Sequence, residues 1–126
     1  MRKPRGADER RRARGFGLGA EAVALAWLVL RGYRVLARHY LAPGGEIDLV
    51  ATRENTIVFV EVKARPDLDA AAQAITAEKR RRLRRAAAFW LSRNRAAVGA
   101  TLRGDAIYVA PWRWPRHVQD AFALDE

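Results

Sequence analysis

The chain has 126 residues, which suits one domain of ordinary size and is too short for two well-packed ones. Half of its residues are hydrophobic, which provides for a core and excludes wholesale disorder. Lys and Arg number 24 against 14 Asp and Glu, and the net charge of +10 favours polyanionic partners, nucleic acid before an acidic membrane surface. The absence of cysteine excludes a disulfide scaffold, a Cys-ligated metal and a thiol nucleophile, and two histidines argue against a multi-histidine metal site.

The positive charge is concentrated in two segments. Residues 1–14 carry seven basic and two acidic side chains, and residues 78–95 carry eight basic side chains against the single Glu78. The rest of the chain is slightly acidic. Two basic segments beside a mildly acidic body suggest a binding surface. We expect residues 1–14 to form a flexible basic tail and residues 15–126 to form a single domain.

An apolar run over residues 22–30 follows the basic start and resembles part of a signal peptide. No small-residue cleavage pattern follows the run, however, and it is far shorter than the ~20 residues that span a bilayer. We therefore expect a cytoplasmic protein with no membrane segment.

Hydrophobic periodicity and turn residues predict elements in the order αβββαβ(β). In chain order they are a helix over 18–31, strands over 33–40, 46–52 and 56–64, a loop or short helix over 66–74, a helix over 76–94, and strands over 106–110 and 117–124. Short connections make the first three strands an antiparallel meander. Thr76 is the expected N-cap of the long helix. This order predicts an α/β or α+β domain, in which helices pack on a mixed sheet.

Acidic residues occur where this fold should place apolar ones. Glu21 lies on the apolar face of the first helix, about 40° from Leu25 and about 20° from Leu28. In the second strand Glu46 and Asp48 share one face, and alternation places Ile47 and Leu49 on the other. For Glu46 we favour a solvated strand face.

Two further charges, Glu61 and Lys63, interrupt the apolar third strand, and buried charges must be paired, metal-bound or at a cleft. The meander brings Asp48 near Glu61, and a hard divalent cation would relieve the repulsion between carboxylates. The alternatives are a plain ion pair between Glu61 and Lys63, and for Glu21 a loop cap or an arginine partner.

The long helix carries one cation on its apolar stripe and several others away from it. Lys79 lies about 20° from Ala86, so it either faces the sheet or extends along its stem to the surface. The arginines are expected to face solvent or a polyanion. The residues expected to bind nucleic acid are Lys79, Arg81, Arg82, Arg84 and Arg85. We expect Trp112 and Trp114 to pack against the sheet, with stacking on bases as the alternative.

The spacing of Asp48 from Glu61-Val62-Lys63 matches the D…ExK signature of the PD-(D/E)xK nuclease superfamily. The longer strings at residues 45–50 (Gly-Glu-Ile-Asp-Leu-Val) and 58–63 (Val-Phe-Val-Glu-Val-Lys) resemble the bacterial YraN family within that superfamily. The resemblance covers roughly residues 15–123, and one departure is His39, where the family often has asparagine.

This resemblance implies a restriction-endonuclease-like core similar to that of Holliday-junction resolvases. It implies that Asp48 and Glu61 bind Mg²⁺, with Mn²⁺ able to substitute, and that the Val62 carbonyl is a further ligand. Lys63 would be the catalytic lysine, and Glu21 would join the metal site from the first helix. Asp105 has no role assigned by the resemblance.

The expected function is therefore a Mg²⁺-dependent nuclease that hydrolyses phosphodiester bonds, with DNA favoured over RNA and branched or structured DNA among the candidate substrates. One alternative is a nucleic-acid-binding module with a nuclease-like fold and no turnover. Another is an interaction protein that docks an acidic partner or RNA on the arginine-rich helix. Resolvase-like proteins act as dimers and an exposed edge strand is available, so a homodimer is allowed without being required.

Overall fold

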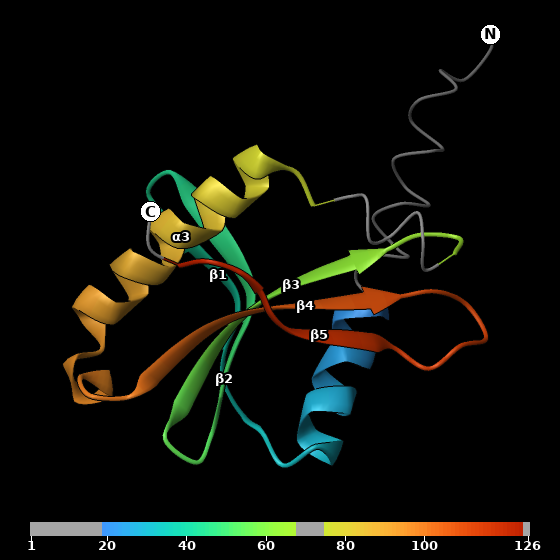
Figure 1. Ribbon diagram of the computed structural model, residues 1–126, viewed down its shortest axis with the longest axis horizontal. Helices are drawn as coiled ribbons and strands as arrows, with labels where there is room; N and C mark the ends of the chain where they lie inside the picture. The colour runs from blue at the N-terminus through green and yellow to red at the C-terminus, as the bar shows by residue number, and fades with distance from the viewer. Residues whose placement is uncertain (1–18, 68–74, 125–126) are drawn as a thin grey trace, which may run out of the picture.

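A computed structural model describes residues 19–67 and 75–124 of the chain (Figure 1). The expected basic tail at residues 1–14 lies outside the described residues. So does most of the loop or short helix expected over residues 66–74.

A five-stranded mixed sheet forms the centre of the fold, with spatial order β1-β2-β3-β4-β5. The strands are β1 (Arg34–Ala42), β2 (Gly45–Arg53), β3 (Thr56–Ala64), β4 (Thr101–Val109) and β5 (Arg116–Phe122). The first three strands pair antiparallel through two tight turns, which confirms the predicted meander. β4 then pairs parallel to β3 after a crossover, and β5 returns antiparallel to β4. The predicted α+β class and order of elements are confirmed.

Helices cover opposite faces of the sheet (Figure 1). The helix that spans residues 19–30 packs Ala24 and Leu28 against Val58 and Val60 of β3. On the other face, α3 (Ala77–Arg93) packs Leu83 and Trp90 against Phe59 and its neighbours. Burial on both faces explains the nearly continuous apolar sequence of β3. Within the described ranges, neither helix is long and apolar enough to cross a membrane.

The N-cap of α3 is the predicted one. The Thr76 hydroxyl accepts a hydrogen bond from the Lys79 backbone N–H at 3.3 Å, which satisfies one of the free donors of the first turn. α3 also crosses β2 at very short range. A Cβ atom on Gly45 would collide with the Arg82 carbonyl oxygen, so only glycine fits at this crossing. The contact fixes the basic first turns of α3 above the β1–β2 turn.

The sheet opens at Asp48. Paired residues of β2 and β3 run from Arg53–Thr56 to Leu49–Val60 and stop there. In place of the next backbone pair, the Asp48 carboxylate accepts a hydrogen bond from the Val62 N–H at 2.7 Å. The neighbouring β1 residue, His39, has a left-handed backbone with φ of 47°. β1 and β2 are therefore both irregular at this point, and the Asp48 carboxylate stands where β2 and β3 would otherwise form their next backbone pair.

This irregularity overturns one predicted face assignment. Ile47 packs in the core under α3 together with Val50, whereas Leu49 packs on the face of the first helix. Strict alternation would have put Ile47 and Leu49 on the same face, and the change of course at Asp48 breaks it.

β4 begins five residues earlier than predicted. Its whole length, from Thr101 to Val109, pairs with β3. The sequence Arg103-Gly104-Asp105 is typical of a loop. In the structure the two charged side chains pair with each other, because the Arg103 guanidinium donates a hydrogen bond of 2.8 Å to the fully buried Asp105 carboxylate. Pairing of these charges allows a polar segment to continue a buried strand.

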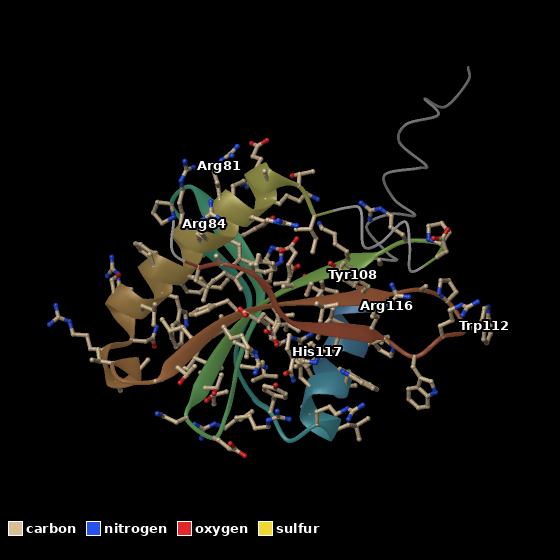
Figure 2. The ribbon with its side chains drawn as sticks, in the orientation of Figure 1. Arg81, Arg84, Tyr108, Trp112, Arg116 and His117 are labelled. Atoms are coloured by element: carbon tan, nitrogen blue, oxygen red, sulfur yellow. The ribbon has the colours of Figure 1, made fainter. Side chains whose placement is uncertain are left out.

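The expected packing of two tryptophans on the sheet is wrong. Trp112 is fully exposed and Trp114 is 79% exposed, both in the turn between β4 and β5. The turn carries Trp112 beyond the edge of the core (Figure 2).

Candidate metal centre

The opening between β2 and β3 gathers the residues of the D…ExK signature. Asp48 reaches in from β2, where the Val62 N–H fixes its carboxylate. Glu61 and Lys63 share one face of β3, and the Lys63 ammonium lies 3.0 Å from Glu61 Oε1. The Asp48 carboxylate lies close enough to Glu61 for its charge to raise the pKa of Glu61. The sequence-predicted trio is thus brought together at one place.

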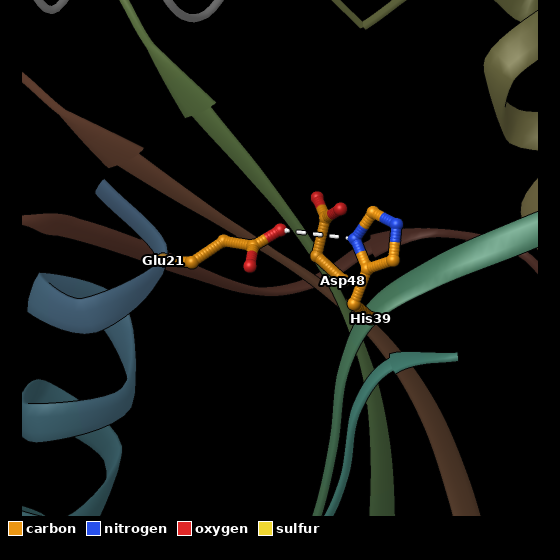
Figure 3. Close-up of side chains that lie close together, drawn as sticks. All are labelled: Glu21, His39 and Asp48. Carbon is orange, nitrogen blue, oxygen red and sulfur yellow. Dashed lines mark ion pairs between the residues drawn. The ribbon is translucent and has the colours of Figure 1, made fainter. Parts of the chain in front are cut away.

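Glu21 approaches the same place from the first helix. Next to it lies His39 of β1, which the sequence did not indicate as a site residue. Glu21, His39 and Asp48 each offer a ligand atom, and these atoms lie within 4.8 Å of one another (Figure 3). His39 Nδ1 is 3.6 Å from Glu21 Oε1. The left-handed backbone at His39 is the local feature associated with this placement. No sequence signal indicates that conformation, since histidine adopts it only in a minority of cases.

Asp48 is the member common to both sets. It contacts Glu61 on β3 and belongs to the trio with Glu21 and His39. Glu61 is not part of that trio in the described residues. Asp48 is therefore the ligand that any ion placed in this opening would share.

Crowding and burial raise the pKa values of the carboxyl groups. The pKa of Glu61 rises to about 7, because the side chain is buried and because the Asp48 carboxylate is close. Burial also raises the pKa of Asp48, although the Val62 N–H and Lys63 partly oppose it. Glu21 has a raised pKa from burial and from the charge of Asp48.

Two lysines meet on the α3 side of the opening. Burial disfavours the charged form of Lys63, but the Glu61 carboxylate outweighs burial and raises the pKa of Lys63. Lys79 contacts Lys63, and burial together with that contact lowers the pKa of Lys79 to about 8. Lys79 therefore lies beside Lys63, which agrees with the sheet-facing placement, and its role in holding phosphates stays a prediction.

The donor set fits a hard divalent cation. Carboxylate oxygens are the ligands that Mg²⁺ and Mn²⁺ prefer, and Asp48, Glu61 and Glu21 supply them. An ion would offset the repulsion that now raises the carboxyl pKa values. The Val62 carbonyl remains a predicted ligand on the basis of the resemblance alone.

The predicted arginines fall into two groups. Arg81, Arg82 and Arg85 line a groove of about 520 Å³ between the first turns of α3 and the β1–β2 turn. Glu46, half-buried, lies in the same groove. Arg84 instead lines a separate, largely apolar groove of about 470 Å³ toward β5 (Figure 2 labels Arg81 and Arg84). Three of the four arginines therefore form one basic surface, which we call the arginine groove.

Asp105 is a structural residue away from this site. Its carboxylate accepts hydrogen bonds from Arg103, from the Asp120 N–H at 3.1 Å and from His117 Nε2, which lies 2.7 Å away. The Arg103 guanidinium also donates to the Tyr33 hydroxyl at 2.6 Å. The network joins β4 to β5 and to the start of β1.

Comparison with known proteins assigns the family. The sequence profile of "Uncharacterised protein family UPF0102" matches residues 20–109, which include the whole opening. The chain belongs to UPF0102. This is the YraN family that the sequence strings resemble.

UPF0102 relatives align over nearly their full length. A UPF0102 protein of Methylorubrum extorquens is 59% identical, with 99% of this chain and 98% of the relative covered. One of Methylobacterium nodulans is 58% identical over 94% of this chain and 93% of the relative. One of Bradyrhizobium diazoefficiens is 46% identical over 97% of each chain. The family assignment therefore covers the candidate metal centre and the sheet around it.

The raised pKa of Glu61 predicts that divalent ions bind with release of a proton. Below about pH 7 the Glu61 carboxyl must lose its proton before it can bind a cation. We expect the Mn²⁺ association constant to fall about tenfold for each pH unit below 7, measured by calorimetry in buffers of different ionisation enthalpy. An affinity that stays constant between about pH 5.5 and pH 8 would contradict this.

The raised pKa of Glu61 also determines how the stability of the folded protein depends on pH. A carboxyl whose pKa is raised on folding adds stability below its unfolded pKa of 4.5 and loses that contribution as pH rises through about 7. The ion-free protein should therefore lose this contribution between those values. Glu61→Gln is the matched control, since it keeps the shape of the side chain and removes the titration.

Proposed function

We propose that this UPF0102 protein is a divalent-metal-dependent nuclease that hydrolyses phosphodiester bonds in DNA. One observation carries the proposal: Asp48, Glu61 and Lys63 converge at the point where β2 separates from β3. A plain structural ion pair needs only Glu61 and Lys63. The second carboxylate in contact with Glu61 raises the energy of the cluster, and a bound cation would remove that cost.

The residues have separate roles in this proposal. Asp48 and Glu61 hold Mg²⁺ or Mn²⁺, and Glu21 contributes from the first helix. When bound, the ion supplies Lewis acidity toward a phosphate oxygen and lowers the pKa of water. Lys63, oriented by Glu61 at 3.0 Å, donates to the oxygen on which negative charge develops or orients the attacking water. Lys79 places a second ammonium beside Lys63.

The arginine groove supports nucleic acid as the substrate. Arg81, Arg82 and Arg85 border a concave surface of about 520 Å³ on the α3 side. Arginines that line a groove bind backbone phosphates without reading sequence, and such binding weakens steeply with salt. A strand held there would extend across the β1–β2 turn, next to the strand in which Asp48 lies.

The second candidate is a nucleic-acid-binding module without turnover. The arginine groove favours it as much as it favours a nuclease. It differs in one measurable respect: binding would be independent of Asp48 and Glu61. A homodimer through an exposed edge strand stays a prediction.

The test is a cleavage assay on supercoiled, linear and branched DNA with Mg²⁺ or Mn²⁺ and with excess chelator. We expect cleavage that requires the ion and disappears in Asp48→Asn. Salt-sensitive binding without cleavage of any DNA, and unchanged in Asp48→Asn, would favour the binding module.

A further inference from the structure

The turn between β4 and β5 exposes two tryptophans that the core does not use. We call residues 111–115 (Pro-Trp-Arg-Trp-Pro) the tryptophan turn. Trp112 is fully exposed at its tip, as Figure 2 shows, and Trp114 is 79% exposed. Trp112 also has a left-handed backbone with φ of 63°, which is unfavourable for a bulky aromatic residue. Neither burial nor backbone preference therefore explains a tryptophan at the tip.

The tryptophan turn stands at the same end of the sheet as the candidate metal centre. The parallel register places Lys63 beside Tyr108 and Ala64 beside Val109. The Arg65 N–H then donates to the Val109 carbonyl at 3.2 Å, and the turn begins immediately after Ala110. A nucleic acid strand that reaches Lys63 from this end therefore passes the tryptophans.

The aromatic surface continues from the turn onto the first helix. The ring centroids of Trp114 and Trp27 are 6.1 Å apart, and the Arg31 guanidinium lies 4.3 Å from the Trp27 ring centroid. Beside them is a cavity of about 250 Å³. Its lining combines aromatic rings with hydrogen-bond donors, from Trp27, Arg31, Tyr33, Arg53, His117 and Gln119.

One donor at this cavity is unsatisfied. The buried Nε1–H of Trp27 has no hydrogen-bond partner in the described part of the chain. Buried indole N–H groups normally find a partner. The combination of exposed ring faces and arginines beside a cavity lined by hydrogen-bond donors suits a planar heterocycle with a phosphate attached, which describes a nucleotide.

Base pairing decides which nucleic acid presents such a group. In a continuous duplex the base faces are stacked on each other and inaccessible to tryptophan, whereas unpaired bases are free to stack on it. We propose that the tryptophan turn, with Trp27 and Arg31, binds unpaired nucleotides and directs the enzyme to single-stranded, flapped or branched DNA. This inference rests on the proposed nuclease function and names its substrate class.

An anionic membrane surface is the other polyanion that accepts tryptophan and arginine side chains. The position of the turn at the Lys63 end of the sheet and the cavity lined by donors favour nucleotides over lipid. Vesicles containing phosphatidylglycerol therefore belong in the test as a separate arm.

The experiment compares the full-length wild type with Trp112→Ala/Trp114→Ala. The probes are a single-stranded oligodeoxythymidylate of about 12 nucleotides and a duplex of equal length, at one low salt concentration with chelator present. We expect the variant to lose at least about tenfold in affinity for the single strand and less than about twofold for the duplex. Val98→Ala, which shortens another exposed apolar side chain, should change neither affinity.

Intrinsic fluorescence gives a second readout. Bound oligodeoxythymidylate should quench the wild type, and the quenching should decrease in the double variant, where Trp27 and the buried Trp90 remain. Trp112→Gly should melt at or above the wild-type temperature, since glycine relieves the left-handed backbone, and should still bind the single strand more weakly. That pair of results separates a binding role from a structural one.

Several outcomes overturn the inference. These are equal single-strand affinity in wild type and double variant, a wild type that prefers duplex, or a loss in the double variant confined to vesicle binding. Because the binding assay contains no divalent cation, a failure of the nuclease proposal leaves its result interpretable. Metal-dependent cleavage with unchanged single-strand affinity in the double variant would keep the nuclease and reject this substrate class.

Discussion

Lys63→Met is expected to lower the single-turnover rate of DNA cleavage by about 10²–10⁴-fold. The substitution keeps most of the length and the apolar stem of the side chain and removes the ammonium that lies 3.0 Å from Glu61. Neither Asp48 nor Glu61 is altered, so both carboxylates remain to bind the ion. Rapid-quench measurements at saturating enzyme and Mg²⁺ give the rate of the chemical step directly.

Metal binding distinguishes the role of Lys63 from that of the carboxylates. Lys63→Met should retain Mn²⁺ binding in calorimetry, whereas Asp48→Asn should lose both Mn²⁺ binding and cleavage, because Asp48 lies both near Glu61 and in the trio with Glu21 and His39. Arg34→Met is the matched charge control, since Arg34 is exposed and pairs at the far end of β2. Equal residual cleavage by wild type and Lys63→Met would indicate a contaminating nuclease and count against the proposed function.

The convergence of Asp48, Glu61 and Lys63 was predictable because it depends on short-range features of the sequence. A tight turn at residues 54–55 fixes how β2 pairs with β3, and this pairing brings the two acidic positions together. The alternation within β3 then places Lys63 on the face of Glu61. No long-range packing has to be known for these steps.

Other features depend on backbone irregularities that a residue pattern does not encode. His39 joins Glu21 and Asp48 at a left-handed backbone position in β1, where regular alternation does not apply. The same irregular region moves Ile47 to the face opposite Leu49. The arginines divide between two grooves because Arg84 faces a neighbour, β5, that is remote in sequence.

The tryptophan turn illustrates how a composition argument fails. Large aromatic residues usually supply the core of a small domain, and Trp90 does so here by packing edge-on against Phe59. Trp112 and Trp114 differ because they lie outside the strands. β4 ends before Pro111 and β5 begins after Pro115, and proline disfavours strand pairing at both positions. Sequence alone indicates the end of the strands, but not that the rings remain uncovered.

Asp105→Ala is expected to destabilise the protein by about 3–5 kcal/mol, the cost of removing one partner from a buried charged network. Asp105 is fully buried, and the substitution would leave the Arg103 guanidinium and the His117 ring without the carboxylate that they contact at 2.8 Å and 2.7 Å. Urea denaturation followed by circular dichroism measures the loss. Asp120→Asn removes an exposed negative charge and suits the left-handed backbone there, so it should change stability little.

Acid titration gives an independent check on the same residue. Burial acts to raise the pKa of Asp105, but the contacts with His117, Arg103 and the Asp120 N–H outweigh it and lower that pKa below 3.8. A carboxyl with a lowered folded pKa adds stability above its unfolded pKa and loses it as pH falls through the folded value. Asp105→Asn should therefore lack this acid-dependent contribution to stability. The network also holds β5 on β4, next to the tryptophan turn. Loss of Asp105 would therefore disturb the turn itself, so effects of tryptophan substitutions on DNA binding must be measured with Asp105 intact.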